Sequence, residues 1–218
     1  MKRQWLNTLS EHERTGYSQA GEEGIIEWIF DNIGAENFFC VEFGAKDGRT
    51  QSNTGALVDK GWNHLLMDCD ATADHVKNEF VTAENINGLF DKYGVPEVID
   101  LLAIDIDGND YWVWKAIDRL ARVVIIECNP QFHKGEAKTI KYNPDHVWEQ
   151  NSYYGASPLA LKRLAESKGM KMIWTNRLNC IFVADYLLPE DWEYNLDYVE
   201  TRGWPPCKDE SKEWVDVD

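Results

Sequence analysis

Short apolar runs alternate with helix-patterned stretches over most of the 218-residue chain. This alternation is typical of βαβ units, and it therefore predicts a mainly parallel sheet with helices on both faces. The first run, 38–43, is nearly all apolar and ends at Gly44, as expected for a strand that is covered on both faces. The later runs predict four further strands, at 64–67, 80–82, 98–104 and 123–126.

The stretches between these runs are long enough for two or three helical turns. A leading helix is expected before the first strand, because apolar residues at 25, 26, 29, 30 and 33 share one stripe and Ser18 or Gly21 is placed to cap its start. Another helix is expected to run from Ser157-Pro158 to Lys168 and to stop at Gly169. The remaining helices are predicted at 52–60, 71–79, 86–93 and 110–120.

Two last strands, 170–175 and 180–184, are separated by a connection short enough for a hairpin. The predicted fold is therefore α/β: a Rossmann-like, predominantly parallel seven-stranded sheet with a terminal antiparallel hairpin and helices on both faces. One domain with a leading helical segment is expected over 1–188. Residues 189–218 form a Trp-rich, acidic C-terminal tail that is predicted to be irregular.

The charge balance excludes some classes of function. The chain has 22 Lys and Arg against 38 Asp and Glu, a net charge of -16, which disfavours binding to a nucleic-acid backbone. No apolar run approaches the ~20 residues that a membrane span needs. The 5 cysteines are odd in number and form no CxxC pair, and the start of the chain does not look like a secretory signal. A reduced, cytoplasmic location is therefore expected.

The loops after the strands are the expected ligand site, because ligands of open α/β sheets bind outside the carboxyl ends of the strands. The first loop contains Glu42, Gly44 and Gly48, and glycines allow a tight turn and a close approach to a ligand. Asp68 ends the second strand, where a carboxylate can accept hydrogen bonds from a ribose diol. The first loop has neither GxGxxG nor a GK[ST] phosphate cradle, which disfavours a dinucleotide or P-loop enzyme.

The loop after the fourth strand has the densest group of polar residues. Asp105, Asp107, Asn109 and Asp110 lie within six residues, and hard cations favour such oxygen donors. The loop is not an EF-hand, because Ala116 occupies the twelfth position. Without a metal, Asp105 or Asp107 is a candidate general base, while Asp110 is placed to cap the next helix. His133 and His146, in later loops, are further candidate bases near neutral pH.

Glu42-x-Gly44-x-x-x-Gly48, Asp68 and the closing hairpin together resemble a class I S-adenosylmethionine-dependent methyltransferase. The ordered segments 17–19, 41–44, 104–108 and 126–129 are similar to the FkbM-like branch, whose characterised members methylate hydroxyls. The resemblance spans about residues 17 to 185. It implies O-methylation of a hydroxyl on a sugar or another small molecule, with S-adenosylmethionine as the cofactor.

The resemblance also implies roles for individual residues. Ser18 and Gln19 would close over the cofactor, and Asp68 would bind its ribose. Either Glu84 or Asn85 would contact the adenine, although Asn85 is equally well placed to cap the helix that starts at Ile86. The cofactor-binding residues implied are Ser18, Gln19, Glu42, Gly44, Gly48, Asp68, Glu84, Asn85 and Asp105.

A subset of these O-methyltransferases uses Mg²⁺, and Asp105, Glu127 and Asn129 occupy the corresponding places. Glu127 and Asn129 are not adjacent, so a metal-free base, Asp105, Asp107 or His133, remains the alternative. Two other functions also stay open. One is a non-catalytic cofactor-binding or interaction module with the Trp-rich tail as its contact surface, and the other is an NAD-dependent oxidoreductase, which the missing GxGxxG disfavours.

Overall fold

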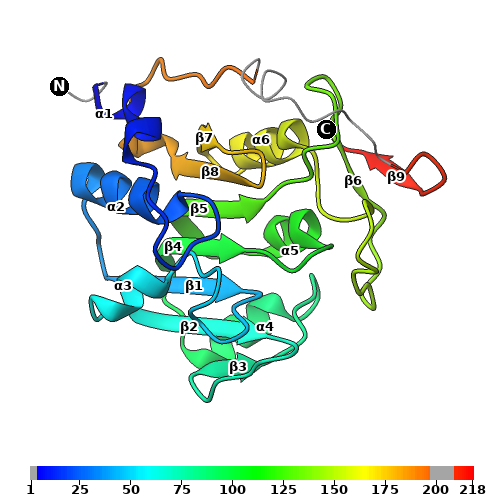
Figure 1. The fold of residues 1–218 in the computed structure, drawn as a ribbon, viewed down its shortest axis with the longest axis horizontal. Helices are drawn as coiled ribbons and strands as arrows, with labels where there is room; N and C mark the ends of the chain where they lie inside the picture. The colour runs from blue at the N-terminus through cyan, green and yellow to red at the C-terminus, as the bar shows by residue number, and fades with distance from the viewer. Residues whose placement is uncertain (1–3, 197–208) are drawn as a thin grey trace.

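The computed structural model describes residues 4–196 and 209–218, and its centre is a seven-stranded sheet of order β3-β2-β1-β4-β5-β8-β7 (Figure 1). β1 to β5 pair in parallel, and β8 pairs antiparallel with both β5 and β7. The predicted Rossmann-like α/β sheet with a terminal antiparallel hairpin is therefore confirmed. The strands are β1 (Phe39–Phe43), β2 (Asn63–Asp68), β3 (Val76–Asn78), β4 (Val98–Ile104), β5 (Leu120–Glu127), β7 (Met170–Thr175) and β8 (Asn179–Ala184).

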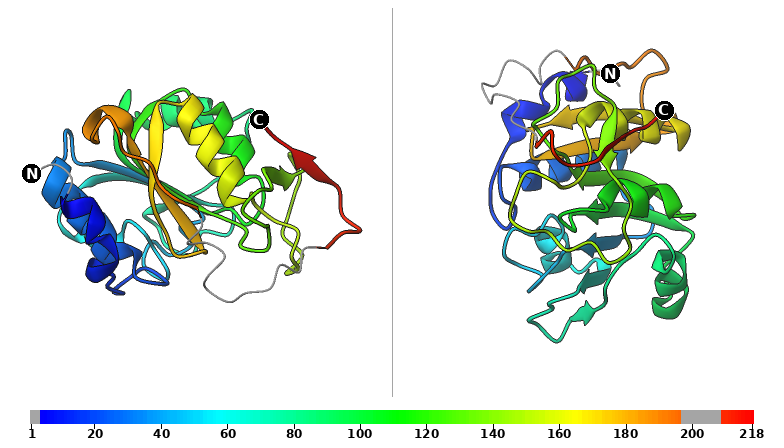
Figure 2. Two further views of the ribbon diagram at one scale, coloured as in Figure 1. Left: turned by 90° about the horizontal axis from the view of Figure 1, so that it is seen from above. Right: turned by 90° about the vertical axis from the view of Figure 1, so that its right-hand side faces the viewer.

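Helices cover both faces of this sheet, as Figure 2 shows from above. One apolar cluster joins α1, η1, α2 and α3 to one face, and a second joins α4, α5 and α6 to the other. Within β4, Leu102 and Ile104 contribute to one cluster while Leu101 and Ala103 contribute to the other, so the strand presents apolar side chains to both faces of the sheet. The helices are α1 (Gln4–Asn7), η1 (Leu9–His12), α2 (Glu22–Ile33), α3 (Gly55–Asp59), α4 (Ile86–Tyr93), α5 (Asp110–Ala116), α6 (Pro158–Ser167) and η2 (Asp185–Leu187).

Local capping signals act as the sequence predicts at two helix starts. Ser157 Oγ accepts a hydrogen bond from the backbone N–H of Ala160 at 3.1 Å, with Pro158 as the first residue of α6. Ser18 Oγ accepts from the N–H of Glu23 at 3.0 Å, in the first turn of α2. α6 therefore begins at the Ser157-Pro158 pair that the sequence singles out, whereas α2 begins at Glu22 after its N-cap residue Gly21, and Ser18 binds its first turn from outside the helix.

Two predicted elements are wrong. Residues 71–79 do not form a helix: β3 lies there, and its register partner for Val76 is Leu66 of β2. The expected strand at 80–82 is a loop. α5 ends at Ala116 instead of continuing to 120, because Leu120 already pairs with Val98 as the first residue of β5.

Residues near the C-terminus pair with a strand from the middle of the chain. β6 (Lys138–Ile140) pairs antiparallel with β9 (Trp214–Asp216), a second sheet that the sequence analysis does not predict. The ring of Trp214 contacts the rings of Phe132 and Tyr153, and its centroid lies 4.8 Å from each of theirs.

The division into a 1–188 domain and a tail stays a prediction, and the tail residues 197–208, with Cys207, lie outside the described residues. Among the described helices, none has the length and apolar character that a membrane span requires.

Candidate cofactor and metal site

A cavity of about 580 Å³ lies at the carboxyl ends of the parallel strands. In Figure 1 this is the side toward which the arrows of β4 and β5 point. The loops after β1, β2 and β4, the end of β5 and part of the 141–154 loop form its walls. Its volume is that of a typical small-molecule site. The polar and charged residues that line it are Gln19, Lys46, Thr50, Gln51, Asp68, Glu79, Asp105, Asp107, Asn109, Glu127 and His146.

Three carboxylates form an acidic cluster in the wall of this cavity. Asp105, Asp107 and Glu127 each offer a carboxylate oxygen, and these oxygens all lie within 4.8 Å of one another. Burial, together with repulsion from the neighbouring carboxylates, raises the pKa of Asp105 and of Glu127 well above the usual range. Oε2 of Glu127 is buried and has no hydrogen-bond partner among the described residues. The cluster therefore has the donor set and the unsatisfied charge that a hard divalent cation would complement.

The loop that carries the cluster folds around Asp110. The carboxylate of Asp110 accepts hydrogen bonds from the backbone N–H groups of Ile106 at 2.8 Å and Gly108 at 2.9 Å. Between them, Asp107 has a φ of 53°, in the left-handed region that non-glycine residues adopt uncommonly. Asp110 thus organises the loop before α5, and the strained backbone of Asp107 is typical of a functional site.

Gly44 allows the first loop to approach the acidic cluster. It has a φ of 72°, and a Cβ atom at this position would lie 1.7 Å from the backbone oxygen of Asp105. No side chain fits there without moving one of the two loops. The sequence predicts that this glycine lets the loop approach a ligand closely. The structure shows that glycine is also needed here for the loop after β1 to pack against the residue that follows β4.

Six of the residues selected from the sequence come together at the cavity: Gln19, Gly44, Asp68, Asp105, Asp107 and Glu127. Asp68 also joins two of the loops. One of its carboxylate oxygens accepts from the N–H of Lys46 at 2.8 Å, and the other accepts from the N–H of Asp70 at 2.7 Å. The carboxylate is thereby held at the cavity wall in a fixed orientation.

Three other selected residues do not line the cavity. Glu42 is buried, and its carboxylate accepts from the Ser52 and Thr54 hydroxyls and from a backbone N–H, each at 2.6 Å. Burial raises the pKa of Glu42, and these hydrogen bonds oppose the rise. Ser18 holds the start of α2, and Gly48 packs against a histidine ring. The structure therefore gives these residues a supporting position behind the wall.

The residues predicted to contact adenine are also engaged elsewhere. The carboxylate of Glu84 accepts a hydrogen bond from the Tyr142 hydroxyl. Asn85 accepts from the N–H of Thr82 at 2.8 Å and donates to the oxygen of Phe80 at 2.8 Å, and its side chain makes no capping bond to α4. The part of this loop that reaches the cavity is 79–81.

Asn129 and His133 do not join the acidic cluster. The amide of Asn129 donates to the oxygens of Ser152 and Tyr154, each at 3.0 Å, and accepts from the N–H of Gln131 at 3.0 Å. Asn129 thus holds the loop that precedes α6. The third residue of the acidic cluster, beside Asp105 and Glu127, is Asp107 and not the predicted Asn129. His133 is exposed and does not line the cavity.

The histidine that does line the cavity is His146. Its ring packs on Gly108, where a Cβ atom would lie 2.3 Å from His146 Cδ2, and its Nε2 is buried without a partner among the described residues. Burial lowers the pKa of His146 and so favours the neutral imidazole. The next residues, Val147 and Trp148, are exposed and also line the cavity. Loops carry no periodicity, so the sequence could point to His146 only by its residue type.

Comparison with known proteins gives a remote likeness only. No protein-family model matches the chain, and neither does any curated protein. Among solved structures, the chain is similar to the N-terminal domain of EvdMO1 in the presence of SAH and D-fucose, with 12% identity, a TM-score of 0.43, and coverage of 83% of this chain and 94% of that one. The same domain with SAH bound gives 12% identity, a TM-score of 0.44 and coverage of 84% and 95%. Likeness at this level assigns no activity to this chain.

Proposed function

We propose that this protein is an S-adenosylmethionine-dependent methyltransferase that methylates a hydroxyl of a small-molecule or saccharide acceptor. The observation that carries the proposal is that Asp68 and the acidic cluster line the same cavity at the carboxyl edge of the sheet. A ribose-binding carboxylate and a set of proton- or cation-binding carboxylates are the two halves that such a reaction needs.

The cofactor half of the cavity lies around Asp68. Its carboxylate is fixed by two backbone N–H groups, which leaves further lone pairs to accept hydrogen bonds from a ribose diol. Phe80 and Val81 line the same cavity and offer an apolar wall for a flat ring. Gly44 lets the backbone approach closely on the other side. The cofactor, when bound, supplies a sulfonium-activated methyl group.

The acceptor half lies around the acidic cluster, in the cavity that His146 and Trp148 also line. Asp105 accepts the hydroxyl proton as the acceptor oxygen bonds to the methyl carbon and the carbon–sulfur bond breaks. The raised pKa of Asp105 brings it closer to that of a useful general base. A divalent cation held by Asp105, Asp107 and Glu127 would orient acceptor oxygens and lower the pKa of the hydroxyl, and the proton acceptor would then be His146.

The deciding experiment is incubation with methyl-labelled S-adenosylmethionine and a panel of sugars and catechols, with and without a chelator, followed by detection of the labelled product. Transfer that EDTA abolishes supports the cation route, and transfer that EDTA leaves unchanged supports Asp105 as the direct base. Binding of the cofactor without transfer to any acceptor would favour the non-catalytic module. Absence of cofactor binding would refute the proposal.

Replacement of Asp68 by Asn is expected to weaken the binding of S-adenosylhomocysteine about tenfold, because it removes the charge that strengthens hydrogen bonds to the ribose. Isothermal titration calorimetry measures this affinity. Asp70→Asn is the matched control, since Asp70 is an exposed acid in the same loop that does not line the cavity. Equal affinities for wild type and Asp68→Asn would place the ribose elsewhere.

Glu127→Gln is expected to abolish most of the cation binding while the protein still folds. Without a cation the variant unfolds at a higher temperature than the wild type, because one like charge leaves the cluster. Mg²⁺ at about 100 times its dissociation constant stabilises the wild type by about 2.7 kcal/mol, and the variant loses most of that response. Thermal unfolding in EDTA and in Mg²⁺ measures both effects, with Glu149→Gln, on the exposed loop, as the control. A wild type that does not respond to Mg²⁺ or Mn²⁺ would argue for the metal-free route.

A further inference from the structure

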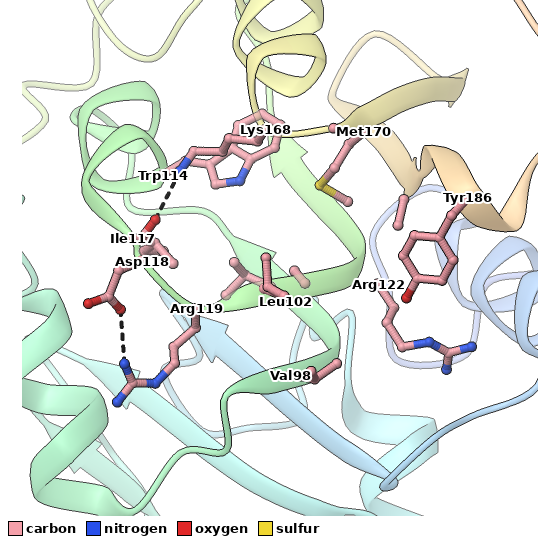
Figure 3. Close-up of a pocket in the computed structure, with 14 residues that line it drawn as sticks. Val98, Leu102, Trp114, Ile117, Asp118, Arg119, Arg122, Lys168, Met170 and Tyr186 are labelled. Carbon is pink, nitrogen blue, oxygen red and sulfur yellow. Dashed lines mark hydrogen bonds and ion pairs between the residues drawn. The ribbon is translucent and has the colours of Figure 1, made fainter.

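A second cavity, of about 360 Å³, lies at the opposite edge of the sheet, where β4 and β5 begin (Figure 3). Its walls come from the starts of β4, β5 and β7, the ends of α5 and α6, and the region from the end of β8 into η2. None of its lining residues lines the candidate cofactor site. The catalytic proposal therefore leaves this cavity unexplained.

The interior of this second cavity is mainly apolar. Leu102, Trp114 and Met170 line it, and Figure 3 shows their side chains around one common space. Leu120 and Tyr186, also in its wall, are 66% and 68% exposed, so large apolar groups face solvent there. An apolar cavity bordered by exposed apolar side chains is typical of a ligand site, and this volume suits a small ligand.

Lys168 gives the cavity a charge that is not neutralised. Its ammonium donates one hydrogen bond, to the backbone oxygen of Ile117 at 2.9 Å, which Figure 3 draws as a dashed line. Within the described ranges 4–196 and 209–218, no carboxylate forms an ion pair with it. The acid whose charge acts on Lys168 is Asp118, which itself pairs with Arg119. Burial lowers the pKa of Lys168, as expected for an ammonium that lacks a counterion.

The two other cations of the cavity wall are already compensated. Arg119 pairs with Asp91 and Asp118, and the guanidinium of Arg122 hydrogen-bonds the buried carboxylate of Asp100. Lys168 is therefore the group that would gain most from an anion. A carboxylate there would form a charge-assisted hydrogen bond in surroundings that exclude much of the water.

We propose that this cavity binds a small monocarboxylate with an aliphatic body, such as a medium-chain alkanoate. The carboxylate lies against Nζ of Lys168, and the chain lies over Leu102 and Met170 toward the exposed side chains of Leu120 and Tyr186. An alcohol of the same length would fill the apolar space but would leave the ammonium without a counterion. The site therefore distinguishes acids from alcohols.

The test uses the full chain with ¹³C-methyl methionine and a titration with octanoate. Met170 lines the second cavity and Met67 lines the first, so their methyl resonances report on the two cavities separately. Octanoate is expected to shift the Met170 resonance in a saturable way and to leave that of Met67 in place. 1-Octanol is expected to bind about tenfold more weakly. An unmoved Met170 resonance at millimolar octanoate would overturn the proposal.

Two lysine variants complete the test. Lys168→Met keeps the aliphatic body of the side chain and removes the charge, so octanoate is expected to bind about tenfold more weakly while 1-octanol binds as before. Lys162→Met is the control, because Lys162 lies on α6, the helix that Lys168 directly follows, pairs with Glu166 and does not line the cavity. Retained 1-octanol binding shows that the Lys168→Met cavity is intact. Equal octanoate affinity in both variants would contradict the role of Lys168.

Discussion

Replacing Asp105 by Asn is expected to lower the rate of methyl transfer about 10²- to 10⁴-fold and to leave the affinity for S-adenosylhomocysteine unchanged. Asp105 shares the acidic cluster with Asp107 and Glu127, so it is placed either to take the acceptor proton or to hold a cation. The amide keeps the shape of the side chain, but it loses the charge and cannot accept a proton. Release of S-adenosylhomocysteine at saturating cofactor measures the rate, and calorimetry measures the affinity.

Asp145→Asn is the matched control for this variant. Asp145 is an exposed acid next to His146, in the loop over the cavity, and it does not line the cavity. Its replacement removes one negative charge near the site without touching the cluster, so the rate is expected to stay within about twofold of the wild type. Full activity of Asp105→Asn would contradict the assignment, whereas a loss of S-adenosylhomocysteine binding would place Asp105 in the cofactor half.

The elements that the sequence predicts well are those whose signal is local. The predicted range 98–104 is that of β4, because a strand buried on both faces requires a run that is apolar at nearly every position, and only Asp100 departs from this here. β3 gave no such signal, since only Val76 of its three residues is buried and its position depends on pairing with β2. The pairing of β6 with β9 joins segments more than 70 residues apart, and nothing local in either segment indicates it.

The candidate site shows the same limit at the level of side chains. Glu42 and Asp105 are both acids at the end of a buried strand, and the resemblance implies that both bind the cofactor. The structure separates them, because hydroxyls of Ser52 and Thr54 enclose the carboxylate of Glu42 while that of Asp105 faces the cavity. Spacing along the chain places a residue at the edge of the sheet. It does not determine which hydrogen-bond donors contact the side chain of that residue in the fold.

Replacing Asp100 by Asn is expected to destabilise the fold by about 3–5 kcal/mol, the cost of breaking a buried ion pair. Asp100 is a fully buried residue of β4 whose carboxylate accepts from the backbone N–H groups of Glu36 at 2.9 Å, Asn37 at 2.8 Å and Phe38 at 2.8 Å. It also accepts from Arg122 of β5. The variant leaves that arginine buried without its main counterion. Urea denaturation measures the loss, with Asp91→Asn as the control.

Asp91 is a suitable control because it pairs with Arg119 while its side chain stays 71% exposed, so its replacement should cost less than about 0.5 kcal/mol.

The dependence of the stability on pH gives a second test of the role of Asp100. Burial alone would raise the pKa of Asp100, but the hydrogen bonds from the backbone N–H groups and from Arg122 outweigh it and hold the pKa below its usual value. The stabilisation is therefore present above the unfolded pKa of about 3.9 and is lost as the pH falls through the folded value. The difference in stability between wild type and Asp100→Asn should shrink below about pH 4, and a difference that stays constant down to pH 2 would show that the carboxylate charge is not its source.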